Sequence, residues 1–274
     1  MNCPPASPPD PGAAFLADLK AGGPLAQRVT MVLAHPDDEA IGAGGQLHRF
    51  ENLTLIVASD GAPRDGRDMR RMGYESTSAY ARARRAELTE ALQSLQLSDH
   101  ALIQLELPDG ELIMAVPVLV SILAEMFERN ETEIVMTHAY EGGHPDHDAL
   151  ALAVRLATQR CRLPPTIIEM PYYHAGPDGW VLQSFPPGGP APVSIELSAD
   201  AWARKSAMLD AHRSQADMLK EFRNPIERFR VAPVHNFMQP PNSGRWLYDQ
   251  VAPSLHPELW LAHARAALAA EGGA

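Results

Sequence analysis

The chain has 274 residues, of which 45% are hydrophobic and 21% are charged, and its formal net charge is −11. This length and composition suit one large or two small folded domains and exclude a largely disordered chain. The acidic balance disfavours nucleic acid and anionic membranes as partners, and two cysteines cannot build a disulfide framework. No apolar stretch reaches the ~18–20 residues of a membrane-spanning helix, and no signal-peptide pattern opens the chain, so we expect a cytoplasmic protein.

Residues 1–27 are rich in proline and are predicted to form an irregular N-terminal arm. Short, nearly continuous apolar runs follow, as is typical of strands buried on both faces. The predicted strands are 28–34, 53–59, 101–107, 132–138 and 165–173. The predicted helices among them are 75–97, 111–130 (with Pro117 in its first turn or at a kink) and 145–160. This alternation predicts an α/β fold: a doubly wound, Rossmann-like three-layer sandwich with a mostly parallel sheet and right-handed crossovers.

The pattern changes after residue 173. Residues 174–192 form a loop rich in glycine and proline, and a short strand is predicted at 193–197. A long helix over 198–222, with Ser198 as its N-cap, and a final helix over 256–273 complete the chain. We therefore predict that 28–274 is a single domain in which 174–274 caps the sheet.

Two polar segments follow predicted strands. The segment AHPDDEAIGAGG (34–45) follows the first strand, and EGGHPDHDAL (141–150) follows the fourth. Ligands of open α/β sheets bind just outside the carboxyl ends of the strands, so the two segments face one crevice if their strands lie close together. In the second segment, Pro145 suits the first position of a helix, which places His144 at the N-cap.

Side chains that can bind a cation lie three residues apart in these segments, as in the pairs His35–Asp38 and His144–His147. This spacing places both members of a pair on one side of a helical turn. Imidazole and carboxylate groups suit a divalent cation, particularly zinc, whose charge also relieves the repulsion between adjacent acids. Two histidines and one aspartate leave a coordination position open for water, which is typical of a catalytic rather than a structural site. The sequence leaves iron or another divalent ion open.

Together, AHPDDE and EGGHPDHDAL resemble the PIG-L/LmbE family of zinc-dependent deacetylases. The resemblance extends to SDG (59–61), RRAE (84–87), LPDGEL (107–112) and KSAMLDAHRSQ (205–215), and covers roughly residues 28–230. It implies an LmbE-like α/β deacetylase domain that removes N-acetyl groups from glucosamine-containing sugars and related amines.

The resemblance also implies roles for individual residues. His35, Asp38 and His147 match the zinc ligands, and Asp37 matches the general base. His144 matches the residue that assists the oxyanion and the leaving amine, with Asp146 orienting it. Glu39 matches the last acid of the first motif, which supports the ligands or the helix start. Some family members use a tyrosine at the position of Gly142 to stabilise the oxyanion, and Tyr140 is the nearby tyrosine of this chain.

Asp60, Arg64, Asp109 and His212 are candidate substrate contacts, although a loop, turn or helix-surface role explains each equally well from sequence alone. We expect zinc-dependent hydrolysis of an N-acetyl amide on an amino sugar or amino-sugar conjugate. Two alternatives stay open, namely a zinc amidohydrolase acting on a non-sugar amide and a non-catalytic relative that binds metal or carbohydrate. The expected partner is a small N-acetylated sugar or conjugate, and the sequence leaves a homo-oligomer open.

Overall fold

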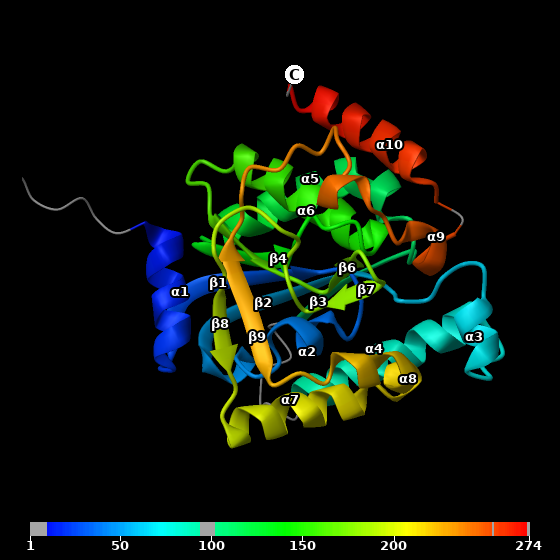
Figure 1. Ribbon diagram of the computed structural model, residues 1–274, viewed down its shortest axis with the longest axis horizontal. Coiled ribbons are helices and arrows are strands. Elements are labelled where there is room, and N and C mark those ends of the chain that lie inside the picture. The colour runs from blue at the N-terminus through cyan, green and yellow to red at the C-terminus, as the bar shows by residue number, and fades with distance from the viewer. Residues whose placement is uncertain (1–9, 94–101, 254, 273–274) are drawn as a thin grey trace, which may run out of the picture.

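The computed structural model of the chain describes residues 10–93, 102–253 and 255–272. Its centre is a seven-stranded sheet in the order β3-β2-β1-β4-β5-β9-β8 (Figure 1). The first five strands pair in parallel, whereas β9 is antiparallel to both β5 and β8. The predicted mostly parallel α/β sheet is therefore confirmed. The strand bounds are β1 Leu25–Leu33, β2 Phe50–Ser59, β3 Leu102–Leu107, β4 Ile134–His138, β5 Thr166–Met170, β8 Val193–Glu196 and β9 Ile226–Val231.

Helices cover both faces of the sheet (Figure 1). The core on one face lies beneath α5, α6 and α10, and the core on the other lies beneath α1, α2, α4 and α7. The strand β1 supplies both cores, because Met31 and Leu33 belong to one and Val32 to the other. The helix bounds are α1 Pro11–Ala21, α2 Asp38–Ala43, α3 Arg67–Arg71, α4 Thr77–Gln93, α5 Leu112–Arg129, α6 Pro145–Arg160, α7 Ala199–Ala211, α8 Ala216–Leu219, α9 Tyr248–Val251 and α10 Pro257–Ala270.

The predicted irregular arm is wrong for residues 11–21, which form α1. Asp10 caps this helix by accepting hydrogen bonds from two backbone N–H groups of the first turn, and Pro11 occupies the first helical position. Phe15 and Leu19 are buried in the core, so the helix is held by packing against the sheet. The division of the chain at residue 28 stays a prediction, although β1 already begins at Leu25.

Three differences concern the part of the chain after residue 173. Strands β8 and β9 extend the sheet at its edge, so this region contributes to the sheet as well as covering it. The predicted helix 198–222 ends at Ala211, because His212 has a non-helical conformation, and short 3-10 and α-helical turns follow it up to Phe222. A hairpin of β6 (Tyr173–Ala175) and β7 (Trp180–Leu182) forms a second small sheet.

The remaining predicted elements agree with the structure within a few residues. The predicted helix 111–130 is α5, and Pro117 lies inside it rather than in its first turn. The last residues of the predicted helix 75–97, from 94 onward, and the first residue of the predicted strand 101–107 lie outside the described residues. No helix of the described ranges is both long and apolar enough to cross a membrane.

Candidate metal and catalytic site

Both histidine motifs lie at the point where the strand order of the sheet reverses. Strands β2 and β3 lie on one side of β1, and β4 and β5 lie on the other, so the crevice falls between β1 and β4. His35 follows β1, and His144 caps the helix α6 that follows β4. The side chains line a pocket of about 520 Å³, a size typical of small-molecule sites.

The three side chains predicted to be zinc ligands face one another in the buried floor of this pocket. Nδ1 of His35 lies 3.3 Å from Nε2 of His147, and these two atoms lie 3.5 Å and 3.4 Å from the carboxylate oxygens of Asp38. Bond lengths of ~2.0–2.1 Å and tetrahedral angles give ligand atoms about 3.3 Å apart across a zinc ion. Two imidazole nitrogens that face each other this closely fit a shared cation. The donor set therefore fits zinc.

The other ring nitrogen of His35 faces two further carboxylates. Nε2 lies 3.2 Å from Asp109 and 3.4 Å from Asp146. Burial lowers the pKa of His35, but Asp109, Asp146 and Asp38 raise it by more, so its pKa lies well above the usual value. A carboxylate at one ring nitrogen fixes the proton there and leaves the other nitrogen free to bind a metal.

The described residues offer three overlapping groups for a cation: His35–His144–His147, Asp38–His138–His147 and His35–Asp109–Asp146. His138 is the least suited of these side chains, because its Nε2 accepts the backbone N–H of Ala34 at 2.9 Å. Its ring stacks on that of His147, with centroids 3.9 Å apart, so it supports the neighbouring ring.

Asp37 adopts an unusual backbone conformation beside the ligand cluster, with φ of 137°. Its backbone N–H donates to Glu39 at 3.0 Å, and its carboxylate pairs with the guanidinium of Arg84 at 2.9 Å. Such a conformation in a non-glycine residue costs roughly 1–3 kcal/mol and is found at functional sites where the surroundings enforce it. Burial raises the pKa of Asp37 to about 7, although Arg84 acts in the opposite direction.

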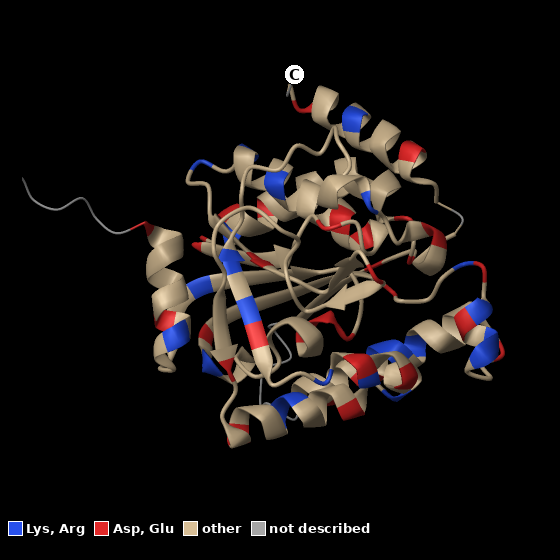
Figure 2. Cartoon of the chain, viewed as in Figure 1, with Lys and Arg blue, Asp and Glu red and all other residues tan. Residues whose placement is uncertain are grey.

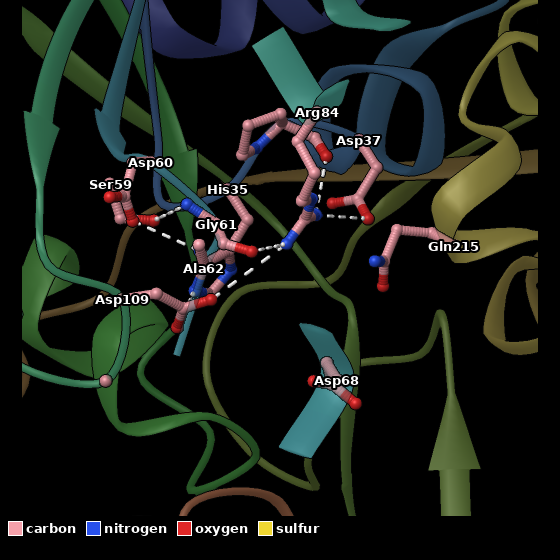
Figure 3. Close-up of polar contacts among 12 residues, drawn as sticks. His35, Asp37, Ser59, Asp60, Gly61, Ala62, Asp68, Arg84, Asp109 and Gln215 are labelled. Atoms are coloured by element: carbon pink, nitrogen blue, oxygen red, sulfur yellow. Dashed lines mark hydrogen bonds and ion pairs between the residues drawn. The ribbon is translucent and has the colours of Figure 1, made fainter. Parts of the chain in front are cut away.

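Arg84 is the functional residue whose role sequence reasoning missed. It is buried and donates to the backbone oxygens of Pro36 and Gly61 as well as to Asp37. Figure 3 shows its guanidinium between Asp37 on one side and Gly61 and Asp109 on the other. The resemblance includes the RRAE segment (84–87) without assigning this arginine a function, and membership of that segment was the available signal.

His144 caps α6, and its Nδ1 accepts the backbone N–H of Asp146 at 3.2 Å. The carboxylate of Asp146 instead accepts the backbone N–H groups of Gly110 and Leu112 and faces His35. The carboxylate therefore does not orient His144, because the first turn of α6 directs it toward the segment before α5. Burial and the nearby His35 and His147 lower the pKa of His144 well below its usual value.

The candidate substrate contacts occupy different places. Asp109 lines the pocket floor beside His35, and Arg64 lines its mouth. Asp60 lies outside this pocket and is paired with Arg64 at 2.8 Å. His212 is only 1% exposed and lies behind the site, where its Nε2 is 2.6 Å from Glu39. It supports Glu39, and the sequence could not indicate this because the two residues belong to distant segments.

Tyr140 does not replace the tyrosine that some family members use. Its hydroxyl donates to the backbone oxygen of Gln239 at 2.9 Å, and it lies among the residues packed beneath α10. Gly142 has φ of 75°, and a Cβ atom there would lie 2.7 Å from the backbone oxygen of Arg245. This position therefore requires glycine, and the pocket lacks a tyrosine at that point.

Comparisons with known proteins show which family model, relatives and solved structure this chain is similar to. Residues 30–158 match the sequence model of the PIG-L family, described as GlcNAc-PI de-N-acetylase. A Bacillus cereus protein named probable N-acetyl-alpha-D-glucosaminyl L-malate deacetylase 2 is 26% identical over 204 residues, which cover 72% of this chain and 87% of the relative. A Bacillus subtilis protein of the same name is 27% identical over 214 residues, covering 74% and 90%. The crystal structure of the A40926 pseudoaglycone deacetylase Dbv21 has a TM-score of 0.56 at 21% identity, covers 71% of this chain and 84% of its own, and shows the same fold.

Proposed function

We propose, from the premise that this chain carries a PIG-L family domain, that it hydrolyses the N-acetyl amide of an amino sugar or amino-sugar conjugate to acetate and the free amine. The relatives named as N-acetyl-glucosaminyl malate deacetylases support an N-acetylated sugar conjugate as the substrate class. One observation carries the proposal. His35, Asp38 and His147 converge in one pocket, and the carboxylate of Asp37, the candidate base, lines the same pocket.

His35 through Nδ1, His147 through Nε2 and the carboxylate of Asp38 would hold zinc. When bound there, zinc polarises the amide carbonyl and makes water a better nucleophile at neutral pH. The remaining chemistry belongs to the side chains of the chain itself. The negative charges of Asp109 and Asp146 lie 3.2 Å and 3.4 Å from Nε2 of His35 and favour a proton on that nitrogen, which leaves Nδ1 available.

Asp37 is the proposed general base. Its carboxylate takes a proton from the attacking water while the water oxygen bonds to the carbonyl carbon. A pKa of about 7 suits this exchange at neutral pH, because such a group both accepts and returns a proton. Arg84 holds the carboxylate in place and favours its ionised form. As the C–N bond breaks, the protonated Asp37 donates to the departing nitrogen, which leaves as the amine.

His144 is the proposed oxyanion donor. Because its Nδ1 accepts a backbone N–H, the neutral ring carries its proton on Nε2. Its lowered pKa keeps the ring neutral at pH 7, so it donates a hydrogen bond without supplying a charge. This differs from the role that the resemblance implies, in which Asp146 orients His144 and His144 also assists the leaving amine, and it assigns the proton transfers to Asp37 alone.

The test is acetate release from N-acetylglucosamine and its glycosides by the purified protein, with metal content measured on the same preparation. We expect acetate release that a chelator abolishes and added zinc restores. Release from simple N-acetylated amines but from none of the sugars would favour the non-sugar amidohydrolase. Sugar binding and metal content without acetate release would favour the non-catalytic alternative.

A further inference from the structure

We propose that Tyr173 and Trp180 form a stacking platform beside the metal site that binds an uncharged ring attached to the acetylated sugar. The inference rests on the proposed function and names the part of the substrate that lies beyond the N-acetyl group. The two residues belong to the hairpin β6–β7, which lies near the carboxyl ends of the central strands (Figure 1).

The rings form a path that leads outward from the ligand cluster. The ring of Tyr173 lies 5.8 Å from that of His147, measured between centroids. The indole of Trp180 stacks on Tyr173 at 5.1 Å with an interplanar angle of 16°. Trp180 is 45% exposed, and its Nε1 donates to the side chain of Gln250 at 2.7 Å. This hydrogen bond fixes the indole orientation, while the part of the indole that does not stack on Tyr173 stays exposed to a ligand.

The platform is continuous with the catalytic pocket. Tyr173 and Trp180 line the same cavity as His147, and Met218 and Phe222 add further apolar surface to it. The pocket of about 520 Å³ therefore runs from the ligand cluster to an exposed aromatic face. A substrate whose acetyl group reaches the floor places its next group against the exposed part of the Tyr173–Trp180 stack, which Trp180 provides. Flat ring faces pack well against such stacked aromatic rings.

The charged residues that line the pocket disfavour an anionic group in this place. Each arginine of the loop and of α3 that lines the pocket pairs with a nearby carboxylate, and Figure 2 shows both charges interspersed on α3. The pairs are Arg64–Asp60, Arg67–Asp65 and Arg71–Asp68. Carboxylates also outnumber guanidinium groups among the residues that line the pocket. An attached group with its own carboxylates meets no unpaired cation there, whereas an uncharged ring meets an apolar platform.

The experiment measures binding by isothermal titration calorimetry with four probes. These are methyl N-acetyl-β-glucosaminide, the phenyl glycoside, N,N′-diacetylchitobiose and a glycoside carrying a dicarboxylic acid. We expect the wild-type protein to bind a ring-bearing probe roughly 5–10-fold more tightly than the methyl glycoside, as one aromatic contact provides. Comparing the affinity for the phenyl glycoside with that for N,N′-diacetylchitobiose shows whether the platform prefers an aryl group or a second sugar ring.

Trp180→Ala should reduce this preference to within about twofold, because the exposed face of the platform is lost. Trp202→Ala is the matched control, since Trp202 is a partly exposed tryptophan on α7 that does not line the pocket. It should leave the preference unchanged. Four outcomes would each overturn the proposal. The wild-type protein could bind all four probes equally well, bind the dicarboxylate probe most tightly, or fail to bind the ring-bearing probes in the millimolar range. The fourth outcome is a preference for ring-bearing probes that survives Trp180→Ala.

Acetate release from the same four compounds separates this proposal from the proposed function. Ring-dependent binding without acetate release would refute the deacetylase and leave the platform supported. Acetate release with no ring dependence in either binding or KM would refute the platform alone.

Discussion

Replacing Arg84 with methionine tests whether this buried arginine sets the properties of Asp37. The substitution keeps most of the apolar side-chain volume but removes the partner of Asp37, which lies 2.9 Å away, and the donors to Pro36 and Gly61. Breaking a buried ion pair by removing one partner costs about 3–5 kcal/mol. For a domain of this size that cost corresponds to a fall in Tm of roughly 6–15 °C.

The effect on catalysis is separable from the effect on stability. Since Arg84 lowers the pKa of Asp37, its loss should raise that pKa above the present value of about 7. An opposite charge at this distance commonly shifts a carboxyl pKa by about 1–3 units. Asp37 must be ionised to act as a base, so activity should rise as pH increases through its pKa. The acidic limb of the kcat/KM profile should therefore move by about 1–3 units to higher pH in Arg84→Met.

The assay is a pH profile of kcat/KM at a temperature well below the Tm of the variant. Arg213→Met is the matched control, because Arg213 pairs with Glu90 of the same helix α4 but on the exposed surface. It should change neither the profile nor the Tm appreciably. An acidic limb that stays in place in Arg84→Met, with protein that is still folded, would refute the assignment of Asp37 as the base or of Arg84 as its partner.

Three further predictions concern the same site. Alanine substitutions of the proposed ligands should lower the metal content measured by mass spectrometry; these are His35→Ala, Asp38→Ala and His147→Ala. The control is His256→Ala, which replaces an exposed histidine and should leave the metal content unchanged. Asp37→Asn should keep the metal but lower kcat by about 10²–10⁴-fold, and near-normal turnover would assign the base elsewhere. His144→Ala should lower kcat while leaving metal content and substrate Kd nearly unchanged, as expected for a group that acts mainly in the transition state; loss of metal would make it a ligand.

The sequence was sufficient for the central part of the fold because the parallel strands are buried on both faces. The run 29–34 is apolar except for Thr30 and is buried along its whole length, which is typical of a central parallel strand rather than of an exposed strand or an amphipathic helix. The N-terminal helix was missed because prolines at its start suggested irregular structure, although Pro11 is at the one helical position where proline costs nothing. The strand β9 was missed because its partners, β5 and β8, are far away in sequence.

The candidate site was predictable where spacing within one segment determines geometry. His35 and Asp38 lie on one turn, and their side chains do face the same point. What the sequence could not provide were contacts between segments. The pairing of Glu39 with His212 and that of Asp37 with Arg84 join residues that are distant along the chain. Both pairings have an electrostatic reason, because a buried carboxylate is stable only beside a hydrogen-bonding or charged partner. The fold places these partners next to the carboxylates.

Asp146 illustrates how a role carried over from a resemblance can assign the wrong partner. The resemblance implies that Asp146 orients His144. The first turn of α6, however, uses the backbone N–H of Asp146 to bind the His144 ring and turns its carboxylate toward His35. The two histidines are therefore suited to different roles. His35 has carboxylates at Nε2, which suits a metal ligand at Nδ1, whereas His144 has no carboxylate hydrogen bond among the described contacts and a lowered pKa, which suits a neutral hydrogen-bond donor.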